Sequence, residues 1–268
     1  MTATTSAPAA VAWSTEEIEV AGSSVRLRSA GRGAPLLVLH HDIGTPEQLP
    51  LYGILAQRFT VLLPSHPGYD GSERPAWMRS VRDVAVTYQA LLAARGLIDV
   101  SALGLGFGGW IAAEMATMAP RGFRRLVLVG PMGIKPATGE ILDQALVSYI
   151  DYVRAGFVDQ SAFERLFGTD PATALLEQWD LNREMTFRIA WKPYMYNPTL
   201  PHLLAGVRTP ALVVWGREDR IVPLECAQQY ARALPGARVV EVEAAGHFVD
   251  MEQPETLAKL VTQFVTES

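Results

Sequence analysis

Cysteine is nearly absent from this 268-residue sequence: Cys226 is the only one, so no internal disulfide can form. No uninterrupted apolar run approaches the roughly 20 residues that a membrane-spanning helix requires. Residues 1–12 lack the charged start and apolar block of a secretory signal. We therefore expect a cytoplasmic protein with no membrane partner and with a disordered segment at 1–12.

The sequence also has no long run of charge of one sign. It carries 23 Lys and Arg against 28 Asp and Glu, a net charge of −5, so no broad basic face is available to bind phosphates. This excludes nucleic acid as an expected partner. The composition is 49% hydrophobic, which is enough to bury a sizeable core. A homodimer is the default expectation if the chain oligomerises.

Short apolar runs alternate with helical patterns, which predicts parallel βαβ units and an α/β fold. An opening hairpin is expected at 17–20 and 25–29. We expect core strands at 36–40, 61–64, 101–105, 125–130, 211–216 and 238–242. Helices are expected at 49–58, 81–95, 109–118, 224–234 and 254–265.

One stretch interrupts this alternation. No strand-like run occurs from 135 to 207, and helical segments rich in aromatic residues and methionine fill the gap. An insertion this long should form its own helical cap between two parts of the core, 13–134 and 208–268. Such a cap would roof a pocket at the carboxyl ends of the strands. Trp191 and Tyr194 are expected to contact substrate there, although such aromatics also serve simply to pack a cap against its core.

The segment from Leu103 to Trp110 has the pattern of a strand, a sharp turn and a helix. Compared with G-x-S-x-G it keeps both flanking glycines but has Gly106 where the serine would be. The same segment also satisfies G-x-G-x-x-G, a dinucleotide fingerprint. That motif requires an acidic residue about 20 positions later, and the strand at 125–130 ends without one. We therefore expect no cofactor.

At this point the sequence resembles the α/β-hydrolase family from about residue 16 to 265. The resemblance rests on five segments in the family's order: His40, 67–72, 104–108, 215–223 and 245–248. It implies a mostly parallel sheet with helices on both faces and a helical cap. The acid and histidine segments are most similar to those of meta-cleavage-product hydrolases, which cleave carbon–carbon bonds.

The resemblance also implies roles for particular residues. Asp219 is the expected acid, which would orient His247 and favour its imidazolium form, while His247 would act as general base. Backbone amides of Asp42 and Phe107 would bind an oxyanion. The structural alternatives are that Asp219 only caps the segment leading to Pro223 and that His247 is a satisfied buried histidine.

The loop after the first core strand departs from the family, which usually has His-Gly where this chain has His40 and His41. A carboxylate at Asp42 would oppose an oxyanion unless it points away or is protonated. His41 or Asp42 could instead orient a water or bind a polar substrate group, or could only hydrogen-bond within the loop. Consecutive residues rarely converge on one ion, so we expect no metal site from His40, His41 and Asp42.

Three functional hypotheses follow from the missing serine. In the first, His247 takes a proton from water or from the substrate itself, so a small, mainly apolar, activated ester or carbon–carbon bond is hydrolysed without an acyl-serine. Direct deprotonation of the substrate would instead give a cofactor-free lyase or oxygenase. In the second, the protein only binds a small ligand. In the third, Gly106 is an altered residue in an ordinary serine hydrolase.

Overall fold

The computed structural model describes residues 11–46 and 49–267, so most of the expected disordered segment lies outside the described residues. An eight-stranded sheet with the order β1-β2-β4-β3-β5-β6-β7-β8 forms the centre. The strands are β1 (Trp13–Val20), β2 (Ser23–Ala30), β3 (Pro35–Leu39), β4 (Thr60–Pro64), β5 (Ser101–Leu105), β6 (Leu126–Val129), β7 (Ala211–Gly216) and β8 (Arg238–Val242).

The sheet is mostly parallel, as predicted. Strands β3 to β8 pair in parallel, whereas β1 pairs with β2 and β2 with β4 in antiparallel fashion. The central strands β5, β6 and β7 are buried along their whole length, because helices cover both faces of a parallel sheet. The hairpin is longer than the sequence pattern indicated, since the exposed residues of β1 give no apolar signal.

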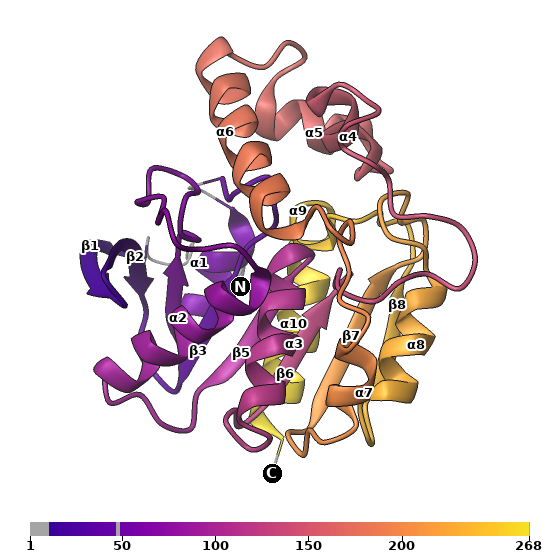
Figure 1. Cartoon of the computed structure of the whole chain (residues 1–268). Coiled ribbons are helices and arrows are strands. Elements are labelled where there is room, and N and C mark those ends of the chain that lie inside the picture. The colour runs from indigo at the N-terminus through magenta and orange to yellow at the C-terminus, as the bar shows by residue number, and fades with distance from the viewer. Residues whose placement is uncertain (1–10, 47–48, 268) are drawn as a thin grey trace, which may run out of the picture.

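Helices lie on both faces of this sheet (Figure 1). On one face α1 packs against α10, and on the other α2 packs against α3. Helices α7 and α8 contact each other, and α7 also contacts α3. Their bounds are α1 (Pro50–Ala56), α2 (Val81–Ala94), α3 (Phe107–Met118), α7 (Leu200–Leu204), α8 (Glu225–Ala233), α9 (Val249–Glu252) and α10 (Pro254–Thr266).

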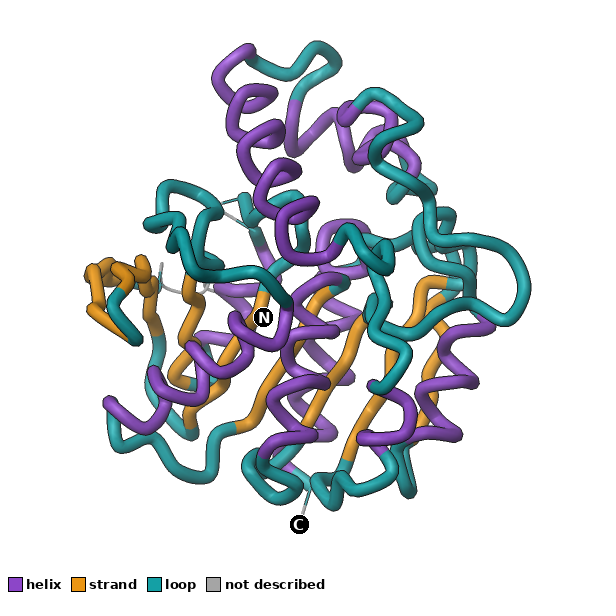
Figure 2. The backbone as a smooth tube through the Cα atoms, viewed as in Figure 1, coloured by secondary structure: helices purple, strands orange, loops and turns teal. Residues whose placement is uncertain are grey.

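Three further helices lie above the carboxyl ends of the strands, as Figure 1 shows: α4 (Tyr149–Ala155), α5 (Gln160–Phe167) and α6 (Thr173–Ala190). Long loops join them to the core (Figure 2). Among the described residues between β6 and β7 there is no strand, only isolated bridges. Helix α7, which also falls within 135–207, packs on the core. The limits 13–134, 135–207 and 208–268 stay a prediction.

Buried polar contacts attach α6 to the core loops. The Asn182 Nδ2 donates to the Ile43 carbonyl oxygen and to Asp70 Oδ1, each at 3.0 Å. The Tyr69 and Thr186 hydroxyls are 2.7 Å apart. Because Asn182, Tyr69 and Thr186 are buried, breaking one of their bonds leaves an unpaired buried group. Helix α6 is therefore fixed over the loop that follows β3.

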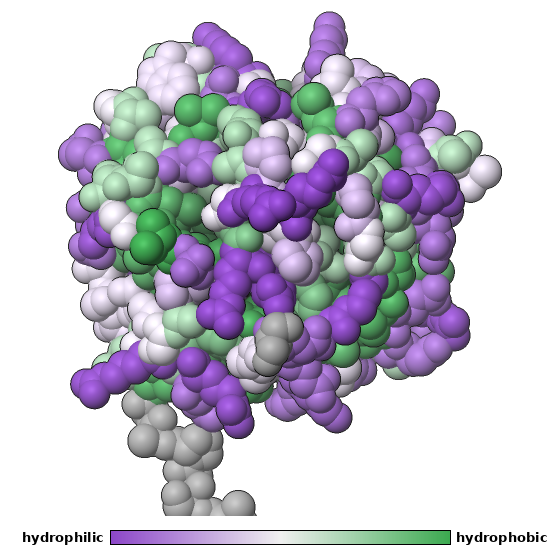
Figure 3. All heavy atoms as spheres, turned by 90° about the horizontal axis from the view of Figure 1, so that it is seen from below, coloured by the Kyte–Doolittle hydropathy of each residue, from purple (hydrophilic) through white to green (hydrophobic). Residues whose placement is uncertain are grey.

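The face turned away from the cap carries interspersed hydrophilic and hydrophobic residues (Figure 3). Within the described part of the chain, no helix combines the length and the apolar character needed to cross a bilayer.

Open α/β sheets bind ligands at the carboxyl ends of their strands. A ligand site is therefore expected at the edge of the sheet beneath α4 to α6.

Replacement of Gly108 by alanine tests how closely α3 approaches β3. A Cβ at this position would overlap the carbonyl oxygen of Leu39, which is backbone and cannot rotate away. We expect Gly108→Ala to lower the free energy of unfolding by about 1–3 kcal/mol or more, measured by urea denaturation. In Gly53→Ala, on α1, the new methyl meets nothing within 4 Å. That control should raise stability by roughly 0.5–1 kcal/mol, and equal losses in both variants would contradict the packing argument.

Candidate active site

The predicted site residues come from loops at one edge of the sheet. Asp42 follows β3, Gly106 follows β5, Asp219 follows β7 and His247 follows β8. These four strands are parallel, so their carboxyl ends lie at the same edge. Segments that are far apart in sequence thereby meet beneath the cap.

Gly106 forms the sharp turn between β5 and α3. Its backbone has φ 51° and ψ −109°, a conformation that side-chain-bearing residues rarely adopt. The Gly106 amide donates to the Val129 carbonyl at 2.8 Å, and the Gly108 amide donates to the His40 carbonyl at 2.9 Å. The turn is therefore held by both neighbouring strands, and the glycines of this segment are used for close backbone packing.

His247 and Asp219 form a buried pair, with His247 Nδ1 2.8 Å from Asp219 Oδ2 and neither side chain exposed. The other oxygen of Asp219 accepts from the amides of Ile221 (2.8 Å) and Val222 (2.9 Å). Asp219 therefore caps its own loop and also orients the imidazole. An ionised carboxylate only accepts hydrogen bonds, so Nδ1 carries the proton and neutral His247 has its lone pair on Nε2.

Two opposing effects act on the protonation of His247. Burial alone lowers the pKa of this imidazole, because it disfavours the charged form. The charge of Asp219 and its hydrogen bond act in the opposite direction, and the net pKa is raised above the usual value. Asp42 and Asp250 add to the increase. The pair is thus built to accept a proton on Nε2.

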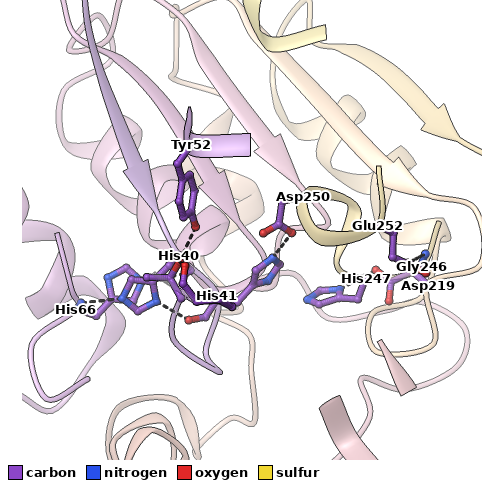
Figure 4. A network of polar contacts seen from close by, with 11 residues as sticks. His40, His41, Tyr52, His66, Asp219, Gly246, His247, Asp250 and Glu252 are labelled. Carbon is purple, nitrogen blue, oxygen red and sulfur yellow. Dashed lines mark hydrogen bonds and ion pairs between the residues drawn. The ribbon is translucent and has the colours of Figure 1, made fainter. Parts of the chain in front are cut away.

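His247 Nε2 faces the space above Gly106. An ideal Cβ at Gly106 would be 2.8 Å from this nitrogen and would overlap Nδ1 of His41. Neither of these nitrogens has a hydrogen-bond partner among the described residues, although both are buried. The His41 and His247 rings lie side by side, with centroids 5.3 Å apart (Figure 4). His41 thus fills the place that a side chain at position 106 would occupy.

Asp42 is fully buried, and its carboxylate is turned toward residues of the cap. Its Oδ2 accepts from the Tyr152 hydroxyl at 2.8 Å and from Nε2 of Gln144. Burial raises the pKa of Tyr152 well above its usual range, with the charge of Asp42 as the next cause, so the phenol stays protonated and donates. For the amides of Asp42 and Phe107 we find no hydrogen bond within the described part of the chain. Both donors are therefore free to bind another oxygen.

No hydrogen bond or ring contact joins Trp191 or Tyr194 to His247 among the described residues. Trp191 is 40% exposed, and its ring packs against Phe187 and Tyr194. The Tyr194 hydroxyl donates to the Leu142 carbonyl and accepts from the Gln144 amide, each at 2.9 Å. Tyr194 thus orders the loop that carries Gln144, the partner of Asp42. Direct substrate contact by the two aromatics stays a prediction.

His40 differs from His41 in having both ring nitrogens occupied. Its Nδ1 donates to the His41 carbonyl at 2.6 Å, and its Nε2 accepts from the His66 amide at 2.9 Å. Burial lowers the pKa of His40, which keeps it neutral. Among the described residues no cluster of three or more His, Cys, Asp or Glu could hold a metal ion. His40 instead fixes the loop that positions His41.

Asp250 is the residue that sequence reasoning missed. Its Oδ1 is 2.8 Å from His41 Nε2, and both side chains are essentially unexposed. Asp250 lies on the short helix α9, three residues after His247. That spacing is the only signal in the sequence, since its partner is 209 positions away. The site thus contains two buried His–Asp pairs on either side of Gly106.

A pocket of about 360 Å³ lies between the cap and the core loops. Its lining includes Ile43 and Asp70 from the core and Phe167 and Trp179 from the cap. His247 does not line this pocket. Because Ile43 directly follows Asp42, the pocket adjoins the loop that carries Asp42, whereas the side chains of the two His–Asp pairs are buried and are not part of its lining.

Comparison with known proteins gives the same fold. A model described as the alpha/beta hydrolase family matches residues 37–260. A 2-hydroxymuconate semialdehyde hydrolase of Pseudomonas sp. (strain CF600) is 28% identical over 274 residues, which cover 94% of each chain.

Two solved structures are also similar at the level of the fold. A mutant of a meta-cleavage product hydrolase superposes with a TM-score of 0.76 at 20% identity, over 94% of this chain and 98% of the other. A 2-hydroxy-6-oxo-6-phenylhexa-2,4-dienoate hydrolase from Rhodococcus sp. gives 0.76 at 19% identity, over 96% and 100%. The segment that the family model matches, residues 37–260, contains the turn at Gly106 and both His–Asp pairs, and it spans most of the sequence. The chain belongs to the alpha/beta hydrolase family.

Proposed function

We propose that this protein hydrolyses an ester or an activated carbon–carbon bond of a small, mainly apolar substrate, with His247 as general base and without a covalent serine intermediate. The observation that carries this proposal is the buried, unpartnered Nε2 of His247 facing Gly106. Position 106 is a glycine and offers no hydroxyl, so the proton that His247 takes must come from water or from the substrate.

The hydrolytic step follows from these positions. His247 Nε2 removes a proton from water while the water oxygen attacks the substrate carbonyl carbon, and the carbonyl oxygen gains the charge. The amides of Asp42 and Phe107 are the donors for that oxygen. The tetrahedral intermediate then expels its leaving group, which receives a proton from the imidazolium. A carboxylic acid and the protonated leaving group result, and no oxidant or cofactor is consumed.

The orientation of Asp42 supports this use of the loop. A carboxylate directed at a developing oxyanion would destabilise it, but this one accepts hydrogen bonds from Tyr152 and Gln144 of the cap. General-base assistance alone contributes about 10²–10⁴-fold, so the substrate must already be activated. The names of the similar hydrolases favour an activated carbon–carbon bond as the first substrate class to test.

His247→Gln tests the base directly. We expect kcat/KM for 2-hydroxymuconate semialdehyde and for a 4-nitrophenyl ester to fall by about 10²–10⁴-fold, because no other group replaces Nε2. His202→Gln, at an exposed position of α7, is the matched control and should keep full activity. Equal turnover by His247→Gln and the parent would refute the proposal. Ligand binding without turnover in the parent would identify a binding protein, and proton removal from a substrate without hydrolysis would identify a lyase or oxygenase.

The dependence of rate on pH provides an independent prediction. His247 must be neutral to act as base, and its pKa is raised above 6.5, so kcat/KM should rise with pH through an inflection above that value. Asp219→Asn removes the largest effect that opposes burial, and only the smaller contributions of Asp42 and Asp250 remain, so the inflection should move to lower pH and the maximal rate should fall. A pH–rate profile of both proteins measures this. An unmoved inflection would show that another group controls the rate.

Gly106→Ser tests whether a serine can simply be restored. The new Cβ would overlap His41, and Gly106 has a positive φ, so we expect a loss of about 1–3 kcal/mol in unfolding free energy. The variant should react poorly with a serine-directed fluorophosphonate. Gly106→Ser with His41→Gly removes the obstacle and should be labelled rapidly. Fast labelling of the single variant would favour an ordinary serine hydrolase with an altered residue.

A further inference from the structure

His41 and Asp250 repeat, on the other side of Gly106, the arrangement of His247 and Asp219. In each pair one ring nitrogen lies 2.8 Å from a carboxylate oxygen, and both side chains are withdrawn from solvent. Figure 4 shows the two rings adjacent, with Asp250 beside His41 and Asp219 beyond His247. The proposed base therefore has a second imidazole as its neighbour.

The hydrogen bond to Asp250 determines which nitrogen of His41 is available. A carboxylate only accepts hydrogen bonds, so His41 Nε2 carries a proton and donates a hydrogen bond to Asp250. The other ring nitrogen, Nδ1, faces the space above Gly106. Nδ1 has no partner among the described residues, and neither does Nε2 of His247. When both rings are neutral, two lone pairs face one small volume. A single molecule with two donors, or one proton, would satisfy both.

We propose that His41, held by Asp250, is a second acid–base residue of this site, which gives a proton to the leaving group while His247 takes one from water. This inference rests on the function proposed above and changes its last proton transfer: for a leaving group that must be protonated, such as an enolate carbon or an alkoxide, His41 gives the proton in place of His247. A phenolate that leaves as a stable anion does not need this proton.

The proton balance closes over one turnover. Before reaction, His41 Nδ1 is protonated and His247 Nε2 is not. Water gives one proton to His247 as its oxygen bonds to the carbonyl carbon, and His41 gives its proton to the leaving group as the bond to carbon breaks. The pair still holds one proton, which returns from His247 to His41 through a water between them. Each substrate bond cleaved consumes one water.

The surrounding charges favour one proton shared by this pair. Among the described residues, the titratable groups that contact His41 or act on it through their charge are Asp250 on α9, His247 after β8, His40 in the same loop and His66 after β4. Asp42 Oδ1 and Asp250 Oδ2 are themselves buried and unpartnered among the described residues. Buried carboxylates disfavour a site in which both imidazoles are neutral, because their charge would be left without compensation.

A pair of substrates separates this role from a structural one. His41→Gln should lower kcat/KM by about 10²–10⁴-fold for 2-hydroxymuconate semialdehyde or an alkyl ester, but by less than about tenfold for the 4-nitrophenyl ester. Added imidazole should restore the first activity in His41→Gly, where glycine is the residue that the family usually has. Equal loss on both substrates, or none on either, would overturn the inference.

The pH profile gives a second readout. The parent should show a bell-shaped profile, since one imidazole must be neutral and the other protonated. His41→Gln should keep only the rising limb. Retention of the bell in His41→Gln would overturn the inference. Loss of activity in His247→Gln but not in His41→Gln leaves the proposed function intact, whereas loss in neither refutes both.

Histidine ¹⁵N NMR of the whole protein decides the same point without a substrate. We expect neutral His41 to carry its proton on Nε2 and neutral His247 on Nδ1, because each of these nitrogens donates to a carboxylate. A proton on His41 Nδ1 in the neutral ring would contradict the proposal.

Discussion

The space above Gly106 accommodates one side chain, and in this protein it contains the ring of His41. An ideal Cβ at Gly106 would overlap His41 Nδ1 and come within 3.1 Å of its Cε1. A side chain at this turn therefore requires the ring of His41 to move. The glycine at the turn and the histidine after His40, which look like two separate departures in the sequence, are linked by this steric contact. The rest of the site depends on the position of His41, because this imidazole is hydrogen-bonded to a second buried carboxylate, Asp250.

Enclosure gives these groups their chemical character. The His–Asp pairs are withdrawn from water, so each carboxylate acts on its imidazole through a medium of low polarity, where a charge is felt more strongly. The cap contributes to this enclosure directly, since Tyr152 and Gln144 hold the carboxylate of Asp42. These two hydrogen bonds direct the carboxylate of Asp42 away from the backbone amide of Asp42. Cap and core thus share the electrostatics of one site, and in the proposed mechanism cap residues act on the reaction through Asp42 without touching substrate.

The sequence predicted the sheet well because its central strands are continuous apolar runs. The limits of β5, β7 and β8 agree with the expected 101–105, 211–216 and 238–242. The pairing of Asp219 with His247 was also accessible, since both follow strands that lie side by side in the sheet. Asp250 and Gln144 were not, because their partners His41 and Asp42 are 209 and 102 positions away and are reached only through packing of the cap and of α9. No pattern of residue types encodes such a contact.

An acid-oriented imidazole can take a proton from water as well as from a serine hydroxyl, so in the proposed reaction a glycine at position 106 changes the course of the reaction more than its base. Without an acyl intermediate, the leaving group cannot depart before water arrives, and both must be present with the substrate in one enclosed volume. Each needs a proton transfer in the same turnover. A single imidazole would have to serve both in succession, whereas two imidazoles facing one point can divide the task. In the mechanism that we propose, His41 takes one of these two tasks, because its Nδ1 lies beside the position that a Cβ on Gly106 would occupy.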